Sequence, residues 1–299
     1  MTKNNMKLLI PNRNLSYILL TTAFVGISFG GLIIRNIHYA DVWQISFFRA
    51  LGFVFSITIM LYYNYRSAIV ENIKKIGSAG FIGGLLHAIA NLLLLFSFSK
   101  TSIANTSFTL SLIPFITAIL AVIILKEIIS FRTLLTMLIA FIGIFIMIKD
   151  GLETNSFYIG NLMALVCAIC FSGFIIIIRK YNKIDMTPTS LISGIVILIV
   201  TFVVSQGNID IPTQEIWLCF FWGAALNGYI NIVLIYSTRF LYASEVTLFT
   251  LVEYSLGPLW VWIFLDESIT QMTLFGGMLV MLSVATYCIY EVYKQRIKT

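Results

Sequence analysis

The chain contains an internal repeat, in which residues 80–136 reappear 140 positions later as residues 220–276. The matched positions include the pairs Gly83 and Gly223, Asn91 and Asn231, and Ser97 and Ser237. Each half of the chain carries five long apolar runs. Because an odd number of spans turns the second copy upside down in a membrane, the sequence predicts two halves related by a pseudo-two-fold axis in the membrane plane.

The apolar runs identify the class of protein. Hydrophobic residues make up 59% of the 299 residues and charged residues 11%, against about 45–50% and 25% in soluble domains. The runs are roughly twenty residues long, the length that crosses a ~30 Å hydrocarbon core as a helix. They do not alternate with polar residues as barrel strands do. We therefore expect an all-α membrane protein.

Ten transmembrane helices are predicted, arranged as two inverted five-helix repeats that cover residues 16–148 and 157–290. The connections between them are short, so no soluble domain is expected. The predicted spans are Ser16–Ile34, Val42–Tyr63, Ile76–Phe98, Ile103–Leu125, Phe131–Ile148, Phe157–Ile178, Thr189–Ser205, Ile216–Tyr236, Val246–Leu265 and Met272–Tyr290.

The positions of Lys and Arg predict the orientation, since cytoplasmic loops are enriched in both. With the N-terminus in the cytoplasm, the outer loops hold only Arg35, Lys100 and Lys149. The inner segments hold Lys3, Lys7, Arg13, Arg66, Lys74, Lys75, Lys126, Arg132, Arg179, Lys180, Lys183, Arg239, Lys294, Arg296 and Lys298. We expect a multi-pass protein of the cell (inner) membrane with both termini cytoplasmic. The net charge of +6 comes from these loop residues, so it does not indicate nucleic-acid binding.

Motifs for enzymatic chemistry are not found in the sequence. There is no nucleotide-binding Gly-x4-Gly-Lys-Ser/Thr loop, no His-Glu-x-x-His helix and no nucleophile–base pair. Cys167 and Cys170 have the spacing of a redox motif but lie inside an apolar run, where helix packing explains them better. His87 has no second strong ligand within a turn, so no metal is expected. We expect no cofactor and no enzymatic activity, with an intramembrane enzyme and a channel as the alternatives.

The sequence resembles a known family at two places. The stretch from Lys100 to Phe115, which continues to Leu125-Lys126-Glu127, is similar to the fourth-helix signature of EamA-type members of the drug/metabolite transporter superfamily. Phe48-Arg49 resembles that family's aromatic–arginine pair. The family pattern usually repeats a proline in the ninth span, directly after a glutamate. Here Tyr254 stands at that position.

The resemblance implies a ten-helix secondary transporter, whose relatives export amino acids, nucleotide-related compounds and other small metabolites. We therefore expect an exporter of a small polar or amphipathic metabolite, such as an amino acid, that works by alternating access. The partners expected are the small-molecule substrate and the lipid bilayer. The sequence favours neither a monomer nor a homodimer.

Two charged residues lie inside predicted spans, where a charge costs at least ~2.5–3.5 kcal/mol and is a candidate for function. Glu253, in the ninth span, is predicted to line the cavity and to carry a proton or bind a cationic group. The alternative is a glutamate that only packs helices together. Arg49, in the second span, is predicted to bind a carboxylate or phosphate, with snorkelling or a structural ion pair as its alternatives. The two residues could also pair with each other.

Several uncharged side chains complete the predicted substrate site. His87 and Asn91 are four residues apart and share a helix face, and Asn227 and Asn231 repeat this spacing in the second half. Donation to substrate competes here with close helix packing, because glycines stand one turn earlier in both halves. Tyr229 and Tyr254 are expected to stack on a ligand.

Two prolines and two glutamates lie at further marked positions. Pro114 and Pro258 interrupt the helical hydrogen-bond ladder and are predicted hinges, with static kinks as the alternative. Glu127 and Glu267 correspond under the repeat and are predicted to end their spans on opposite sides of the membrane.

Overall fold

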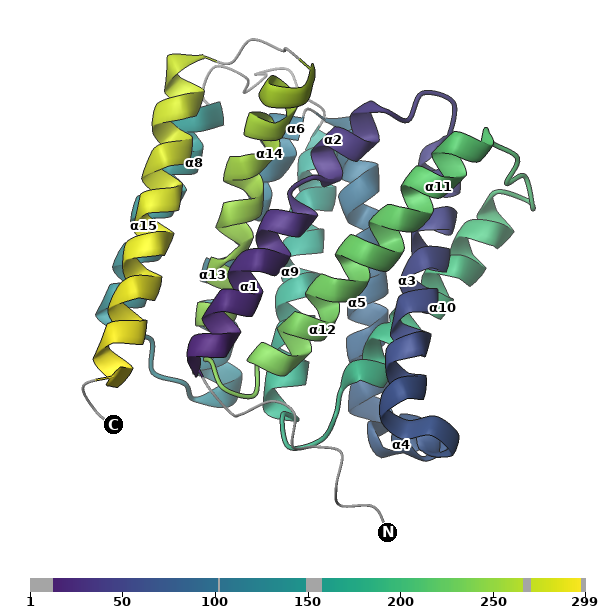
Figure 1. The fold of residues 1–299 in the computed structure, drawn as a ribbon, viewed down its shortest axis with the longest axis horizontal. Coiled ribbons are helices and arrows are strands. Elements are labelled where there is room, and N and C mark those ends of the chain that lie inside the picture. Colours follow the sequence, from purple (N-terminus) through teal and green to yellow (C-terminus); the bar gives the residue numbers. More distant parts are fainter. Residues whose placement is uncertain (1–12, 102, 149–157, 266–269, 297–299) are drawn as a thin grey trace.

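Helices make up nearly all of the computed structural model, which describes residues 13–101, 103–148, 158–265 and 270–296 (Figure 1). Within these residues, nine helical segments are long and apolar enough to cross a membrane, and Phe131–Met147 is a shorter apolar helix. These ten segments correspond one to one with the predicted spans. The prediction of an all-α membrane fold is therefore confirmed.

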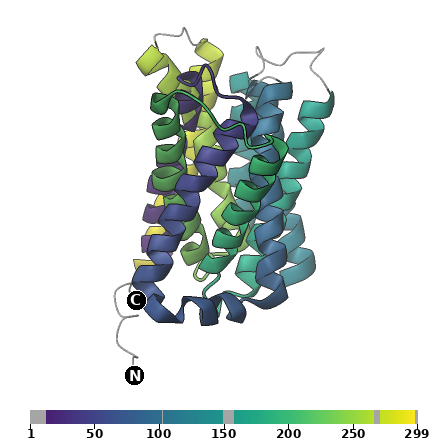
Figure 2. The same cartoon turned by 90° about the vertical axis from the view of Figure 1, so that its right-hand side faces the viewer.

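The first half contains α1 to α8. The helices are α1 (Arg13–Ile27), α2 (Gly30–Arg35), α3 (Val42–Tyr65), α4 (Ile69–Lys75), α5 (Gly77–Lys100), α6 (Ile103–Leu110), α7 (Ile113–Leu120) and α8 (Phe131–Ile148). A π-helical turn, Ala121–Leu125, extends α7. The short α4 lies across one end of the bundle (Figure 2), within the connection between the second and third predicted spans.

The second half contains α9 to α15. The helices are α9 (Tyr158–Lys180), α10 (Thr187–Val204), α11 (Thr213–Phe221), α12 (Gly228–Ser237), α13 (Ala243–Leu248), α14 (Thr250–Leu265) and α15 (Gln271–Arg296). A π-helical segment, Trp222–Asn227, joins α11 to α12 within one span. The first residue of α1 and the last residues of α15 lie at the same end of the bundle (Figure 1).

The packing of the helices follows the internal repeat. In the first half, α5 packs on α9 and α10, which are the first two spans of the other half. In the second half, α12 packs on α1 and the π-helical segment packs on α3, which again are the first two spans of the opposite half. Corresponding spans also meet, since α3 contacts α10 and α8 contacts α15. This exchange of partners is the arrangement expected of two inverted five-helix repeats.

Three spans are interrupted within their length. The first breaks between α1 and α2, where Phe29 stacks on Trp260 with ring centroids 4.3 Å apart. The fourth breaks between α6 and α7, directly before Pro114. Proline has no backbone N–H to donate, so a break at this position is expected. The ninth breaks at Phe249, between α13 and α14.

The second predicted hinge, Pro258, belongs to α14, but its side chain lies outside the described residues. The interruption of this span lies nine residues earlier, at Phe249. Both hinges therefore stay predictions. Glu267 also lies outside the described residues.

Glycines allow the two halves to approach closely. A Cβ atom built on Gly223 would lie 1.8 Å from the backbone oxygen of Arg49, and one on Gly52 would lie 2.1 Å from the backbone oxygen of Phe220. Small residues that let backbones meet in this way are typical of helix interfaces in lipid. Close backbone packing therefore joins α3 to the π-helical segment at the level of Arg49.

We predict that Gly223→Ala destabilises the fold. The new methyl group would meet backbone atoms, which cannot move aside as a side chain can, and overpacking of this kind costs about 1–3 kcal/mol. A thermal melt of the detergent-solubilised protein measures the loss. Gly257→Ala is the control, because a Cβ at Gly257 meets nothing within 4 Å. Equal melting temperatures for the two variants would contradict the packing described.

Candidate substrate site between the two halves

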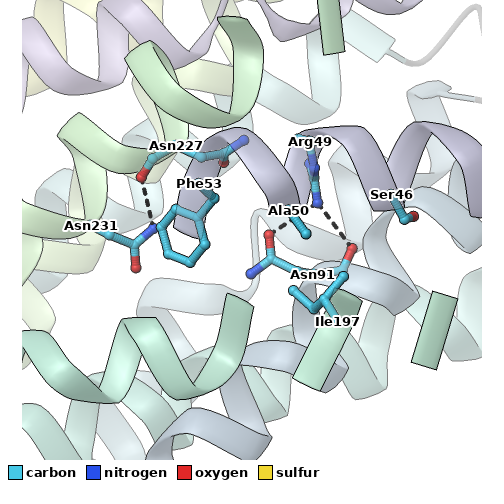
Figure 3. Close-up of a pocket in the computed structure, with 8 residues that line it drawn as sticks. All are labelled: Ser46, Arg49, Ala50, Phe53, Asn91, Ile197, Asn227 and Asn231. Carbon is cyan, nitrogen blue, oxygen red and sulfur yellow. Dashed lines mark hydrogen bonds between the residues drawn. The ribbon is translucent and has the colours of Figure 1, made fainter. Parts of the chain in front are cut away.

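A small cavity lies where α3, α5, α10, α12 and the π-helical segment meet (Figure 3). Its lining comes from both halves of the chain. The lining residues are Ser46, Arg49, Ala50, Phe53, Asn91, Ile197, Asn227 and Asn231. The cavity among them has a volume of about 10 Å³, roughly what a single water needs and far below the ~300–1,000 Å³ of usual ligand pockets. The site is therefore contracted in this conformation.

Arg49 is the charged residue of the cavity lining. Its side chain leaves α3, is 5% exposed, and donates from Nη2 to the side-chain oxygen of Asn91 at 3.0 Å and to its backbone oxygen at 3.3 Å (Figure 3). The guanidinium also lies over the ring of Trp222, 4.9 Å from its centroid. Arg49 is thus fixed by one residue from each half, and it neither snorkels nor forms an ion pair with a described residue.

Part of the Arg49 guanidinium remains available to a ligand. The group carries five N–H donors, and the bonds to Asn91 use only Nη2. Among the described residues, Nε and Nη1 have no hydrogen-bond partner. A planar cation with unused donors suits a carboxylate or phosphate, which accept two parallel hydrogen bonds.

A hydrogen-bonded chain holds Asn91 in place. His87 contacts the hydroxyl of Ser193 through Nδ1 at 2.9 Å, and its Nε2 contacts the amide nitrogen of Asn91 at 3.1 Å. The same amide nitrogen donates to the backbone oxygen of His87 at 3.0 Å. These contacts turn the Asn91 oxygen towards Arg49. His87 is 2% exposed and stacks on Phe174, so it orients Asn91 instead of lining the cavity.

The second half supplies the other two amides. Asn231 donates to the backbone oxygen of Asn227 at 3.0 Å (Figure 3), which repeats the bond from Asn91 to His87 four residues before it. Asn227 donates to the backbone oxygen of Trp222 at 3.3 Å. This bond spans the π-helical segment from its last residue to its first. Local π-helical turns are frequent at functional sites.

Glu253 and Tyr254 approach the site from α14 without lining the cavity. The charges of Arg49 and Glu253 are close enough to interact electrostatically, but no ion pair joins them in this conformation. The carboxylate of Glu253 has no hydrogen-bond partner among the described residues. Tyr254 packs against a cluster that contains Ala90 and Cys167.

Tyr229 lies apart from the other predicted site residues. Its side chain is 38% exposed, and its hydroxyl shares a hydrogen bond with Thr22 of α1 at 2.9 Å. It therefore takes part in the contact between α12 and α1. Tyr229 is not among the residues that line the cavity.

Four lining residues were not predicted from the sequence. Ser46 and Phe53 lie three residues before and four residues after Arg49 on α3, so helical spacing counted from Arg49 would have indicated them. Ala50 is the next residue after Arg49, and that spacing does not indicate it. Ile197 comes from α10, and nothing in its sequence neighbourhood distinguishes it from the other apolar residues of that helix. No cluster of three or more metal-ligating side chains occurs in the part of the chain that the structure describes.

Comparison with known proteins identifies the family of this chain. The model of the EamA-like transporter family matches residues 14–149 and again residues 158–288. A curated relative from Bacillus subtilis (strain 168), the uncharacterized transporter YyaM, is 30% identical over 143 residues. That match covers 45% of this chain and 46% of the relative, so it spans about half the length of each.

A solved structure, described only as the crystal structure of a protein, has the same fold. It superposes with a TM-score of 0.76 at 12% identity and covers 92% of this chain and 97% of its own. The family matches and the apolar helices together identify a multi-pass membrane protein of a transporter family. The chain belongs to the EamA-like transporter family.

Proposed function

We propose that this transporter exports a small polar or amphipathic metabolite, such as an amino acid, by alternating access. The observation that carries the proposal is the meeting of Arg49 and Asn91 from the first half with Asn227 and Asn231 from the second half in one cavity. A site shared by two inverted repeats can open towards either side as the halves move. We take residues 16–148 and 157–290 as these two halves.

The charges near the cavity favour a substrate with an acidic group. The unused donors of Arg49 suit a carboxylate, and the three amides offer further donors and acceptors. An unpaired carboxylate inside the membrane is costly unless it takes up a proton or meets a cation. Glu253 can therefore receive either a proton or the ammonium group of the substrate. An amino acid carries both of the groups that this pair of charges suits.

The orientation and the direction of transport belong to the same proposal. The excess of Lys and Arg at the end of the bundle that holds the start of α1 supports a cell-membrane protein with both termini in the cytoplasm. Export rests on the resemblance to exporters in the family. Exchange for protons through Glu253 and unassisted facilitation are the two modes of driving that we consider.

Counterflow in proteoliposomes tests this function. Purified protein is reconstituted into vesicles loaded with one unlabelled amino acid at a time, and uptake of the same labelled compound is followed. We expect saturable uptake of at least one compound, and none in vesicles without protein. A sustained single-channel conductance would contradict alternating access and favour a channel. Chemical conversion of the compound would favour an enzyme.

A further inference from the structure

A network of ion pairs joins the two halves at one end of the bundle. This is the end at which α1 begins and α15 ends, and α4 crosses it (Figure 1). Of the ion pairs between described residues that involve both halves, all lie here. They are Arg13 with Glu245 at 2.7 Å and Arg179 with Glu127 at 2.6 Å.

Both pairs act on one short segment, residues 238–245, which comprises the connection from α12 to α13 and the first three residues of α13. Glu127, from the first half, also accepts a hydrogen bond from the backbone N–H of Ala243 at 3.0 Å. Arg179 donates to the backbone oxygen of Thr238 at 2.7 Å. The two members of this ion pair thus hold the segment at Thr238 and at Ala243, and Glu127 ties it to the first half.

The second pair holds the start of α13. Glu245 receives hydrogen bonds from Arg13 at 2.7 and 2.8 Å and from the hydroxyl of Tyr287 at 2.9 Å. Its carboxylate also accepts the backbone N–H of Tyr242 at 2.9 Å. The ring of Tyr242 lies between the two arginines, 6.0 Å from the guanidinium carbon of Arg13 and 5.6 Å from that of Arg179.

A third contact between the halves reaches the same segment from α3. The hydroxyl of Tyr65 donates to Asp185 of the second half, and Asp185 pairs with Arg239 at 3.2 Å. Residues 238–245 are therefore held by the first half at three places, through Tyr65, Glu127 and Arg13.

These contacts are buried enough for their loss to matter. The side chains of Glu127 and Glu245 are 10% and 6% exposed. Exposed pairs contribute about 0–1 kcal/mol, whereas removal of one partner of a buried pair leaves a charge without compensation. Such a charge is better hydrated when this end of the bundle opens to water. The pairs therefore favour the closed form of this end.

The segment also lies between α12, which supplies Asn231 to the candidate site, and α13, which precedes α14 and Glu253. Before the segment in the chain comes α12, which runs from Gly228 to Ser237. Asn227 directly precedes this helix, and Asn231 lies within it. After the segment, α13 leads through the break at Phe249 into α14, which carries Glu253. A ligand that moves α12 or α14 therefore acts directly on residues 238–245.

We propose that residues 238–245 form a gate that closes this end of the transport path, latched to the first half by Glu127 and Arg13. The inference rests on the proposed alternating access, in which this end must open once in each cycle. The gate opens when the segment leaves Glu127 and Arg13 and moves with α12 and α13. The charge bias of the loops makes this the cytoplasmic gate.

The test measures access to a buried position behind the gate. Val246 is 0% exposed and follows Glu245 on α13. We introduce Val246→Cys into a background whose four native cysteines are replaced, and add Glu127→Gln or Arg13→Gln. The rate at which a membrane-impermeant maleimide labels Cys at position 246 is measured in detergent. We expect each variant to raise the rate at least about tenfold, the effect of about 1.4 kcal/mol on the closed state.

Glu71→Gln is the matched control. Glu71 pairs with Lys75 at 2.9 Å on α4, at the same end of the bundle, but this pair lies within one helix and its glutamate side chain is 68% exposed. The control removes the same charge and should leave the labelling rate unchanged. Equal rates in the parent, Glu127→Gln and Arg13→Gln proteins would overturn the gate.

Separate measurements show whether a change in the labelling rate comes from misfolding or from the gate. Size-exclusion chromatography and a thermal melt select folded protein, and the two variants break different pairs, so one can replace the other if a variant does not fold. The labelling needs no substrate. If no counterflow is seen but the variants still raise the labelling rate, the proposed cargo is rejected and the gate is kept. If counterflow is seen but the variants leave the labelling rate unchanged, only the gate is rejected.

Discussion

Replacement of Glu253 by Gln is expected to reduce exchange at least about tenfold, a loss of about 1.4 kcal/mol or more, while the protein stays folded. The amide keeps the size of the side chain but cannot carry a proton or attract a cation. Glu253 has no hydrogen-bond or ion-pair partner among the described residues, so the substitution removes no contact that supports the fold. Counterflow in proteoliposomes measures the rate, and the melting temperature reports folding.

Glu253→Asp is the companion variant, because it keeps the charge and shortens the side chain. We expect it to retain more exchange than Glu253→Gln. Assaying both variants with and without a pH gradient identifies the mode of driving. Proton exchange predicts that the parent protein and Glu253→Asp respond to the pH gradient and that Glu253→Gln does not. Unchanged kinetics in Glu253→Gln would demote Glu253 to a packing residue.

The second large effect is expected at Arg49. Arg49→Ala removes the cation of the cavity, and loss of one partner of a buried charged hydrogen bond costs about 2–5 kcal/mol. The apparent KM for an acidic substrate should therefore rise by at least about tenfold. Arg49→Lys keeps the charge but loses the planar fork, so it should give an intermediate KM. Concentration-dependent counterflow measures both values.

The matched control is Arg66→Lys, which makes the same exchange at an exposed residue between α3 and α4. It should leave the KM unchanged. Normal transport by Arg49→Ala would reject the acidic-group site. If Arg49→Ala has a low melting temperature, the KM of Arg49→Lys decides the question instead, because its side chain preserves a donor to Asn91.

The sequence predicted the ten spans because runs of about twenty apolar residues have few other stable arrangements in a bilayer. It also predicted the inversion, because the repeat can be read from matched residues and each half has an odd number of spans. The interruptions were harder to place. Pro114 marked one of them, since its missing N–H acts locally. The break at Phe249 has no proline beside it, and the stacking of Phe29 on Trp260 depends on residues 231 positions apart.

The candidate site was predictable where a polar residue stood out in an apolar run. Arg49, Asn91, Asn227 and Asn231 were found in this way, and they meet in the cavity. Tyr229 met the same criterion but faces Thr22, because a hydroxyl on a helix can serve packing as well as binding. The gate gave no local signal, since Arg13 and Glu245 are 232 residues apart.

Alternate exposure of the cavity between the halves is the central claim, and a single cysteine at Ser46 tests it most directly. Ser46 lines the cavity and is 1% exposed, and Ser46→Cys changes its size little. A membrane-impermeant maleimide is applied to one side of oriented vesicles at a time. We predict that the reagent reaches this cysteine from each side in separate experiments, while the vesicles stay sealed to the reagent. No reaction from either side would contradict the account.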